Sequence, residues 1–359
     1  MREESINHID FDELNHKAIS QPLIQHIYTA DPSAHVFNGK IYIYPSHDID
    51  AGEAFDDLGS HFAMEDYHVI SMDSPTSEAK DNGIALHVNE VPWAEKQMWA
   101  PDAAEKDGKY YLFFPAKDYD GIFRIGVAVS NFPTGPFTPQ PEAIKNSFSI
   151  DPAVFKDTDA CLDESVRQGS YYMYFGGIWG GQLQRWRTGI FNSENPESPV
   201  THLPKDDEPA LCAKVAKLTN DLLEFAEEPK DVVIIDEHGN PLLQGDTERR
   251  FFEASWMHKY KGKYYFSYST GDTHFICYAI GDNPYGPFKY AGKILNPVVG
   301  WTSHHSIVDF EDEWYLFYHD SSLSKGVTHL RSIKVAKLIH DDNGFIKTIE
   351  PYGDLKSLV

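Results

Sequence analysis

A tight polar turn followed by an aromatic strand recurs five times along the chain. Each copy starts with Gly or acidic residues and continues with closely spaced Tyr, Phe, Trp and Ile positions. The copies occupy residues 38–44, 107–113, 168–174, 261–267 and 311–317. This order is typical of a β-hairpin, because Gly and Asp accept the backbone of a tight turn and aromatic residues favour strands.

Each aromatic segment is followed by another strand, and two of these strands lead into the same turn sequence. Residues 125–130 run into PTGPF at 133–137, and residues 276–280 run into PYGPF at 284–288. Units of several strands, repeated at intervals of roughly 50 to 90 residues, are typical of radial blades of four-stranded sheet. A β-sandwich also has many short strands, but it has no reason to repeat one local motif at long period.

The chain is therefore predicted to be all-β and to form a five-bladed β-propeller, a single domain over residues 1–359. The blades are expected to begin near residues 31, 100, 151, 253 and 304. Helices are scarce, and the best candidate covers residues 211–226 in a polar insert. An outer strand near residues 344–350 belongs either to the last blade or to a bridge between the last blade and the first.

Charge and cysteine content exclude several classes of partner and site. The net charge is -24, from 31 Lys+Arg against 55 Asp+Glu, so neither nucleic acid nor an anionic membrane is expected as a partner. Apolar runs fall well short of the roughly 20 residues that span a bilayer. Cys161, Cys212 and Cys277 are widely spaced, which argues against a disulfide framework or a zinc site. The polar residues 1–21 predict a cytoplasmic protein, or a secreted or periplasmic one whose signal peptide has been trimmed.

Carboxylates and histidines recur just before the aromatic hairpins. The segments are Asp31-Pro32, Pro101-Asp102, Asp151-Pro152, Glu253-Ala254 and His304-His305. In a propeller the innermost strands line the central channel, so these residues are expected to converge on one pocket. Carboxyl groups held together push one pKa upward, which places a proton donor beside a proton acceptor. Glycoside hydrolysis requires such a pair.

These motifs, in this order over about residues 31–318, resemble glycoside hydrolase family 43. The resemblance implies an inverting exo-glycosidase, a β-xylosidase or α-L-arabinofuranosidase, that releases terminal xylose and/or arabinofuranose from oligosaccharides derived from xylan or arabinoxylan. Asp31 would be the general base, Glu253 the general acid, and Asp151 the third acid that keeps the donor protonated. An inverting pair stands roughly 6.5–9.5 Å apart, whereas a gap of about 5 Å indicates a retaining mechanism.

Four further residues are candidates for binding the sugar. Trp99 and Trp179 are expected to form walls of the pocket, although Trp99 also suits a core position. Phe252 either raises the pKa of the neighbouring donor by desolvation or serves packing alone. Arg331 is placed near the base by the family resemblance, and a surface ion pair is the alternative.

The resemblance also implies a calcium ion on the propeller axis with His304 as its histidine, and no organic cofactor. Calcium prefers oxygen ligands, so His304 would face a largely hydrated ion; the alternative is a buried histidine that hydrogen-bonds a carboxylate. His47, His68 and His274 lie apart without metal-ligand spacing and are expected to be surface or structural residues. The expected partner is an oligosaccharide, and the oligomeric state is left open.

Three rival functions remain open at this point. An arabinan- or galactan-acting enzyme would share the motifs, a non-catalytic carbohydrate-binding propeller would share the fold, and a related fructan-acting fold would carry a different N-terminal motif. An endo-acting enzyme needs an open groove. The inserts at residues 49–65 and 192–249 are expected to wall the groove off, which favours exo action. The chain carries no G-x-S-x-G, H-E-x-x-H, P-loop or dinucleotide-binding motif.

Overall fold

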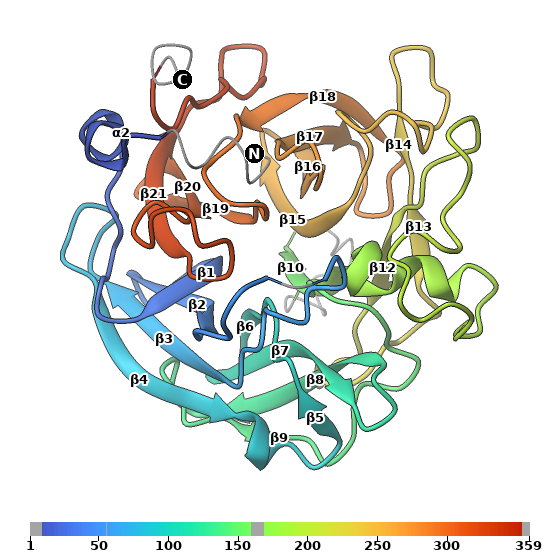
Figure 1. Cartoon of the computed structure of the whole chain (residues 1–359). Coiled ribbons are helices and arrows are strands. Elements are labelled where there is room, and N and C mark those ends of the chain that lie inside the picture. The colour runs from blue at the N-terminus through green and yellow to red at the C-terminus, as the bar shows by residue number, and fades with distance from the viewer. Residues whose placement is uncertain (1–8, 55, 159–168, 354–359) are drawn as a thin grey trace.

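The computed structural model describes residues 9–54, 56–158 and 169–353, and it arranges five β-sheets around a central axis (Figure 1). One strand of each sheet lies innermost: β1 (Tyr28–Phe37), β6 (Asp102–Lys106), β10 (Ala153–Asp157), β15 (Glu253–Tyr260) and β19 (His305–Phe310). Strand β1 contacts β6 and β19, β10 contacts β6 and β15, and β15 contacts β19. The innermost strands therefore form a closed ring, and the predicted five-bladed β-propeller is confirmed.

Each innermost strand pairs outward with the rest of its blade. Blade one continues with β2 (Lys40–Asp48), β3 (Asp66–Met72) and β4 (Lys80–His87). Blade two adds β7 (Lys109–Asp118), β8 (Phe123–Ser130), β9 (Thr138–Pro139) and β5 (Ala94–Lys96). Blade three adds β11 (Ser170–Phe175), β12 (Ala213–Lys217) and β13 (Lys230–Val232). Blade four adds β16 (Lys263–Ser269), β17 (Ile276–Gly281), β18 (Phe288–Leu295) and β14 (Ile234–Ile235), and blade five adds β20 (Glu313–Asp320) and β21 (Ser332–Leu338).

Two-residue turns join the innermost strand to the second strand in four blades. Phe37 pairs with Lys40, which leaves Asn38 and Gly39 at φ 53° and 76°. Positive φ at both central positions is typical of a type I′ turn, whose twist matches that of the flanking strands. The same conformation occurs at residues 107–108, 261–262 and 311–312. The predicted turn of the third hairpin includes Gln168, which lies outside the described residues.

The ring closes through the segment that precedes β1. The Leu23 amide of this segment donates to the Ile333 carbonyl of β21, and the Thr29 amide at the start of β1 donates to the Arg331 carbonyl just before β21, each at 2.9 Å. Residues 344–350 form a hairpin with residues 339–341, which directly follow β21 of blade five, and the predicted bridge to the first blade was wrong. The Ile349 amide donates to the Ile294 carbonyl at 2.7 Å, so this segment extends the edge of blade four.

The predicted helix at residues 211–226 was wrong, because this stretch carries strand β12 instead. Val215 pairs with Tyr174 of β11, and Leu222 adopts φ 61°, a backbone conformation that no right-handed helix allows. The described residues contain one α-helix, α2 (Phe11–Lys17), whose first turn is capped by the Asp10 carboxylate. Three short 3₁₀ segments follow: η1 (Val88–Glu90), η2 (Trp179–Gly181) and η3 (Leu183–Trp186).

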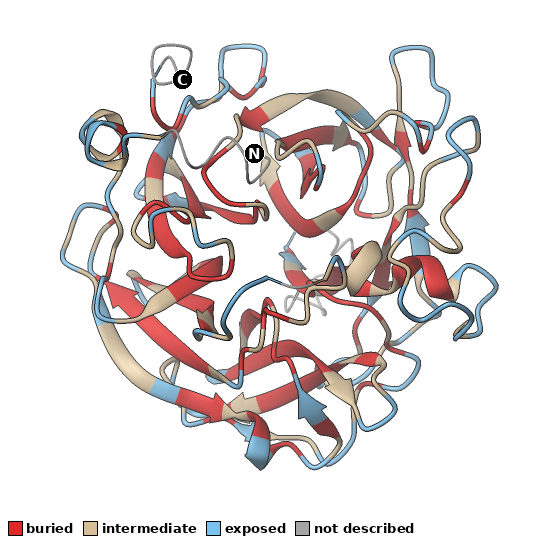
Figure 2. Ribbon diagram, in the orientation of Figure 1, coloured by how far each residue is buried: buried red, intermediate tan, exposed pale blue. Residues whose placement is uncertain are grey.

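Burial follows the radial plan of the sheets. Figure 2 shows buried residues along the inner and middle strands and exposed residues mainly on the loops and outer edges. Tyr and Phe side chains from adjacent blades fill the space between sheets, as at Tyr67 against Phe114 and Tyr174 against Phe266. Within the described residues, no helix has the length and apolar character needed to cross a bilayer. Cys212 and Cys277 are free thiols, and Cys161 lies outside the described residues.

Candidate active site

A cavity of about 1000 Å³ opens over one end of the central channel. Its lining includes Asp31 from blade one, Asp151 from blade three and Glu253 from blade four. All eight site residues predicted from the sequence line this cavity: Asp31, Trp99, Asp151, Trp179, Phe252, Glu253, His304 and Arg331. Residues that lie up to 300 positions apart in the chain are thus brought together by the radial symmetry of the fold.

An irregular backbone aims the acids into the cavity. Asp31 and Asp151 have φ values of 50° and 56°, and Ala254, next to Glu253, has φ 62°. The register of β1 against β2 shifts between Ala30 and Ser33, as expected for a β-bulge, and β15 has the same kind of shift after Glu253. Such conformations are unfavourable for non-glycine residues and concentrate at functional sites.

Asp31 is held in its ionised form. Arg331 Nη1 lies 2.9 Å from Asp31 Oδ1, and the Ser46 hydroxyl donates to Oδ2 at 2.7 Å. Burial is the largest influence and acts to raise the pKa of Asp31. It is outweighed by the nearby Arg331, His319 and His304 and by the Ser46 hydrogen bond, which together lower that pKa to about 2. A buried carboxylate that stays ionised at neutral pH can accept a proton from water.

Asp151 and Glu253 are shifted in the opposite direction. Burial raises the pKa of Glu253 to about 8, with the Asp31 charge adding to the effect and Arg331 opposing it. Burial, followed by the charges of Glu253 and Asp31, also raises the pKa of Asp151 well above its usual range. Asp151 Oδ2 accepts a hydrogen bond from the Ala254 amide at 2.8 Å, which ties it to the backbone beside Glu253. The cavity therefore holds an ionised carboxylate and a protonated carboxyl group, the two groups that general acid–base catalysis requires.

Arg331 is buried, so the surface ion pair considered from the sequence was wrong. Its guanidinium donates to both oxygens of Asp48, at 2.7 and 2.8 Å, as well as to Asp31. It also donates to Thr302 Oγ1 at 3.0 Å. One cation thus links two buried carboxylates, and this arrangement makes up for part of the cost of removing all three charges from water.

Sequence reasoning missed four polar residues around this group: Ser46, Asp48, Thr302 and His319. The His319 ring accepts the Asp31 amide proton at Nδ1 over 3.0 Å, and burial lowers the pKa of His319 to about 3, which keeps the ring neutral. A signal for all but Thr302 was present, because Ser46-His47-Asp48 and His319-Asp320 end their aromatic strands with polar residues. An antiparallel hairpin returns the end of its second strand to the start of its first, and Ala30 indeed pairs with Ser46.

Aromatic side chains form the walls of the cavity. Trp99 donates through Nε1 to the Phe62 carbonyl at 2.8 Å, and its ring packs against a glycine whose absent side chain leaves room for it. A Cβ on that residue, Gly59, would stand 2.8 Å from Trp99 Cη2. Trp179 lies in η2, with its ring centroid 5.6 Å from that of Trp301, another residue that sequence reasoning missed.

Phe252 supports this wall from behind. Its side chain is 1% exposed, and its ring lies 5.4 Å from Trp179 and 5.6 Å from Trp301. A Cβ on Gly271 would come within 2.2 Å of the ring, so the space beside Phe252 is filled. This geometry fits both roles expected for Phe252, since a packed ring next to Glu253 also excludes water from the donor.

His304 lines the cavity just before β19. Its Nδ1 accepts the His305 amide proton at 2.9 Å, and its Nε2 lies 3.8 Å from Asp151 Oδ2, too far for the hydrogen bond to a carboxylate that was the alternative. Asp102 lies outside the cavity lining. It accepts hydrogen bonds from the Ser33 hydroxyl and the Val154 amide, and so joins the innermost strands of the first three blades.

The loops around the cavity differ in part from expectation. The insert at residues 49–65 contributes much of the lining, from Asp50 to Met64. The insert at residues 192–249 contributes none, because it supplies the outer strands β12, β13 and β14 instead. Residues 178–181 of blade three and residues 301–302 and 326–331 of blade five line the cavity as well.

Comparisons with known proteins agree on one family. The model of "Glycosyl hydrolases family 43" matches residues 19–162. A xylosidase/arabinosidase 43A of Humicola insolens is 60% identical over 92% of this chain and 99% of its own length. A xylosidase/arabinosidase of Bacteroides ovatus is 59% identical over 90% of this chain and 95% of its own. A β-xylosidase/α-arabinofuranosidase from a compost microbial metagenome, solved with xylotriose in a calcium-free form, is 62% identical with a TM-score of 0.88 and covers 93% of this chain and 98% of its own.

Proposed function

Because the chain belongs to glycosyl hydrolase family 43, we propose that it is an inverting exo-glycosidase. It releases terminal xylose and arabinofuranose units from oligosaccharides derived from xylan or arabinoxylan. The observation that carries this proposal is the opposite protonation of two carboxyl groups in one cavity, with the pKa of Asp31 lowered to about 2 and that of Glu253 raised to about 8. A carbohydrate-binding protein without catalysis has no use for this difference.

The reaction follows from these protonation states. Asp31, ionised and oriented by Arg331, removes a proton from a water molecule as the water attacks the anomeric carbon. Glu253, protonated, donates its proton to the departing glycosidic oxygen on the other side of the sugar. Asp151 accepts the Ala254 amide next to Glu253, and burial and the Glu253 charge raise its own pKa, so in this proposal it orients the donor as a neutral neighbour.

Exo action is supported by the walls of the cavity. The 49–65 insert and the blade-five segments at residues 301–302 and 326–331 surround the acids, and Trp99 and Trp179 add flat faces on which a sugar ring can stack. A terminal pentose fits such a site better than the middle of a long chain does. Xylopyranose and arabinofuranose present similar hydroxyl arrangements near the cleaved bond, so one cavity can accept both.

A calcium ion at the channel axis is a further part of the proposal. His304 Nε2 is buried without a hydrogen-bond partner, and the axis gathers no three potential ligand groups within the described part of the chain. This environment fits a calcium ion that keeps most of its water ligands, with His304 as the protein group nearest to the ion. Such an ion supplies positive charge, which favours the ionised form of nearby carboxylates. Chelation followed by calcium titration, read by activity and by thermal midpoint, tests this part.

The decisive experiment is hydrolysis of 4-nitrophenyl β-D-xylopyranoside and 4-nitrophenyl α-L-arabinofuranoside by the native enzyme and by Glu253→Ala. We expect turnover of at least one substrate, a large loss in the variant, and a smaller loss on these aryl glycosides than on xylobiose, because nitrophenolate needs little protonation to leave. Glu237→Ala, on an exposed turn, is the matched control.

Proton NMR of the first product formed tests inversion, because β-xylosides should release α-xylose. A native enzyme that is inactive on both aryl substrates but active on arabinan or galactan would favour the rival substrates. An unchanged Glu253→Ala variant would remove Glu253 from the role of donor.

A further inference from the structure

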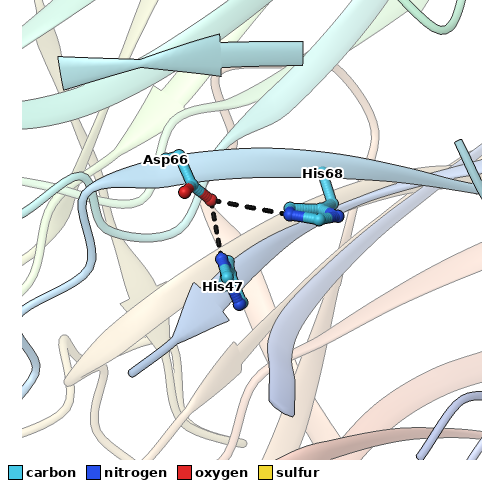
Figure 3. Close-up of side chains that lie close together, drawn as sticks. All are labelled: His47, Asp66 and His68. Carbon is cyan, nitrogen blue, oxygen red and sulfur yellow. Dashed lines mark hydrogen bonds and ion pairs between the residues drawn. The ribbon is translucent and has the colours of Figure 1, made fainter. Parts of the chain in front are cut away.

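Two histidines and an aspartate form a cluster outside the active-site cavity (Figure 3). His47 Nδ1 lies 2.7 Å from Asp66 Oδ1, and His68 Nε2 lies 3.9 Å from the same oxygen. The two imidazole rings stand 4.6 Å apart at an angle of 61°. The expectation that His47 and His68 lie apart, as unrelated surface or structural residues, was therefore wrong. One ligand atom from each of the three residues falls within 4.8 Å of the others.

The strand pairing of blade one explains why the sequence spacing hid this cluster. Ile43 of β2 pairs with Ile70 of β3, and continuing this antiparallel register brings His47 opposite Asp66, the first residue of β3. His68 follows Asp66 by two positions and so projects from the same face of the strand. Cross-strand neighbours on one face of a sheet have no fixed spacing in sequence, unlike the C-x-x-C or H-x-x-x-H patterns that mark metal sites on turns and helices.

A second layer of residues orients His68. Its Nδ1 lies 2.9 Å from Asp81 Oδ1, and Asp81 in turn accepts the Gly83 amide at 2.8 Å and contacts His26 Nε2 at 2.9 Å. A carboxylate at Nδ1 fixes the proton there and leaves the lone pair of Nε2 facing Asp66. This is the arrangement that surrounds histidine ligands of metal ions, in which a carboxylate holds the ring nitrogen not bound to the metal.

We propose that His47, Asp66 and His68 bind a divalent transition-metal ion of the Zn²⁺ type. Two imidazoles and one carboxylate match the ligand preference of zinc, and a water molecule would complete a tetrahedral set. The ion takes the place of the proton between His47 Nδ1 and Asp66 Oδ1, and that proton moves to His47 Nε2 or to solvent. Calcium and magnesium fit poorly, because both prefer all-oxygen sites.

Burial of the three side chains favours a specific site over a loose surface contact. Their exposed fractions are 18% for His47, 13% for Asp66 and 11% for His68, so the ligands are already held by packing and the entropy cost of binding is reduced. None of the three lines the active-site cavity. The ion would therefore tie β2 to β3 and stabilise blade one, while the chemistry of hydrolysis remains with Asp31 and Glu253.

The test is Zn²⁺ binding to the chelator-treated full chain, measured by isothermal titration calorimetry with Ca²⁺ and Mg²⁺ as comparison ions. With Ca²⁺ present to saturate the proposed axial site, we expect saturable binding of one Zn²⁺ and a further rise in thermal midpoint, since an ion that binds only the folded state stabilises it. His68→Asn and Asp66→Asn should each weaken this event at least tenfold. His238→Asn, at a histidine that is 74% exposed, should leave it unchanged.

Activity on 4-nitrophenyl β-D-xylopyranoside in Ca²⁺ without Zn²⁺ verifies that each variant is folded, because the three ligands lie outside the cavity. Should a variant lose this activity, anomalous diffraction at the zinc edge of native crystals decides the matter instead. A peak among His47, Asp66 and His68 supports the proposal. Zinc bound elsewhere, for instance at other histidines, or equal binding by native and folded variant proteins, overturns it.

Discussion

Arg331 bridges Asp31 and Asp48, with one guanidinium nitrogen 2.9 Å from Asp31 Oδ1 and another 2.7 Å from Asp48 Oδ1. Asp48 holds the cation in place, and the cation keeps the base of the proposed reaction ionised. Burial alone would raise the pKa of Asp31, and Arg331 is the largest of the opposing influences. The acidic side of the pH–activity profile therefore depends on a residue from the opposite end of the chain.

Replacing Arg331 by Gln should move the acidic limb of kcat/KM to higher pH. The pKa of Asp31 starts at about 2 and rises when the positive charge is lost, so a larger fraction of the base is protonated in mild acid. We expect a loss of roughly 10²-fold or more at neutral pH, within the range that a general base contributes.

Because Gln leaves Asp48 buried without its partner, Arg331→Gln combined with Asp48→Asn serves as the control for folding. The double variant should regain thermal stability but keep the displaced acidic limb. A limb that stays in place in both variants would mean that Arg331 does not set the ionisation of Asp31.

Glu253 should set the alkaline limb. Its pKa is raised to about 8, and the proposed donor acts only while protonated, so kcat/KM should fall as the pH rises through about 8. The limb should be steep for xylobiose, whose leaving group requires a proton. For an aryl xyloside with a highly acidic phenol it should flatten, because departure no longer depends on the donor. Identical limbs for both substrates would assign the alkaline transition to another group.

The same shift predicts that Glu253 destabilises the folded protein at alkaline pH. The folded-state pKa of about 8 exceeds the ordinary glutamate value of 4.5, so this carboxyl has no unfavourable effect on stability below about pH 4.5 and an increasing one as the pH rises to about 8. Glu253→Gln keeps the shape and removes the charge. We expect its thermal midpoint to exceed that of the native protein at pH 9 and to match it at pH 4. A difference that does not depend on pH would contradict this account.

The sequence was sufficient for the propeller because its signal is local and repeated. Turn pairs such as Asn38-Gly39, each followed by aromatic residues, specify a hairpin without help from distant parts of the chain. Asp31, Asp151 and Glu253 were found for the same reason, since each precedes a recognisable hairpin. Residues 211–226 were mistaken for a helix because their strand pairs with β11 after a long connection.

Residues that act through partners in other blades could not be placed from the sequence. The role of Asp48 depends on its contact with Arg331, 283 positions away. The role of His319 depends on its contact with Asp31, 288 positions away. The sequence around Asp48 and His319 does not mark them as functional residues, because each lies at the polar end of an aromatic strand. Cross-strand clusters such as His47 with Asp66 share this difficulty, since their contact depends on register and not on spacing.

Gly59 should control the position of Trp99. A Cβ there would lie 2.8 Å from Trp99 Cη2, closer than side chains tolerate, so Gly59→Ala should displace the ring and weaken sugar binding. We expect KM to rise several-fold with a smaller change in kcat, because Asp31 and Glu253 are untouched. Gly52→Ala is the matched control: it lies on the same insert with φ 85°, close to the 74° of Gly59, but a Cβ at Gly52 would have no atom within 4 Å. Equal effects of the two variants would point to backbone strain in place of the contact with Trp99.

The turn of blade five offers a way to stabilise the protein without touching the cavity. Its central residues, Glu311 and Asp312, adopt φ 54° and 65°, whereas the corresponding turns of blades one, two and four place Gly at the second position. Left-handed backbone is unfavourable for residues with a Cβ, so Asp312→Gly should increase the free energy of unfolding by up to about 1 kcal/mol. The reverse change at the equivalent position, Gly39→Asp, should lower it by a similar amount, since no atom lies within 4 Å of a Cβ there and strain alone is tested. Urea midpoints of the two variants, compared with the native protein, measure both effects, and a destabilised Asp312→Gly would show that the Asp312 side chain contributes more than its backbone strain costs.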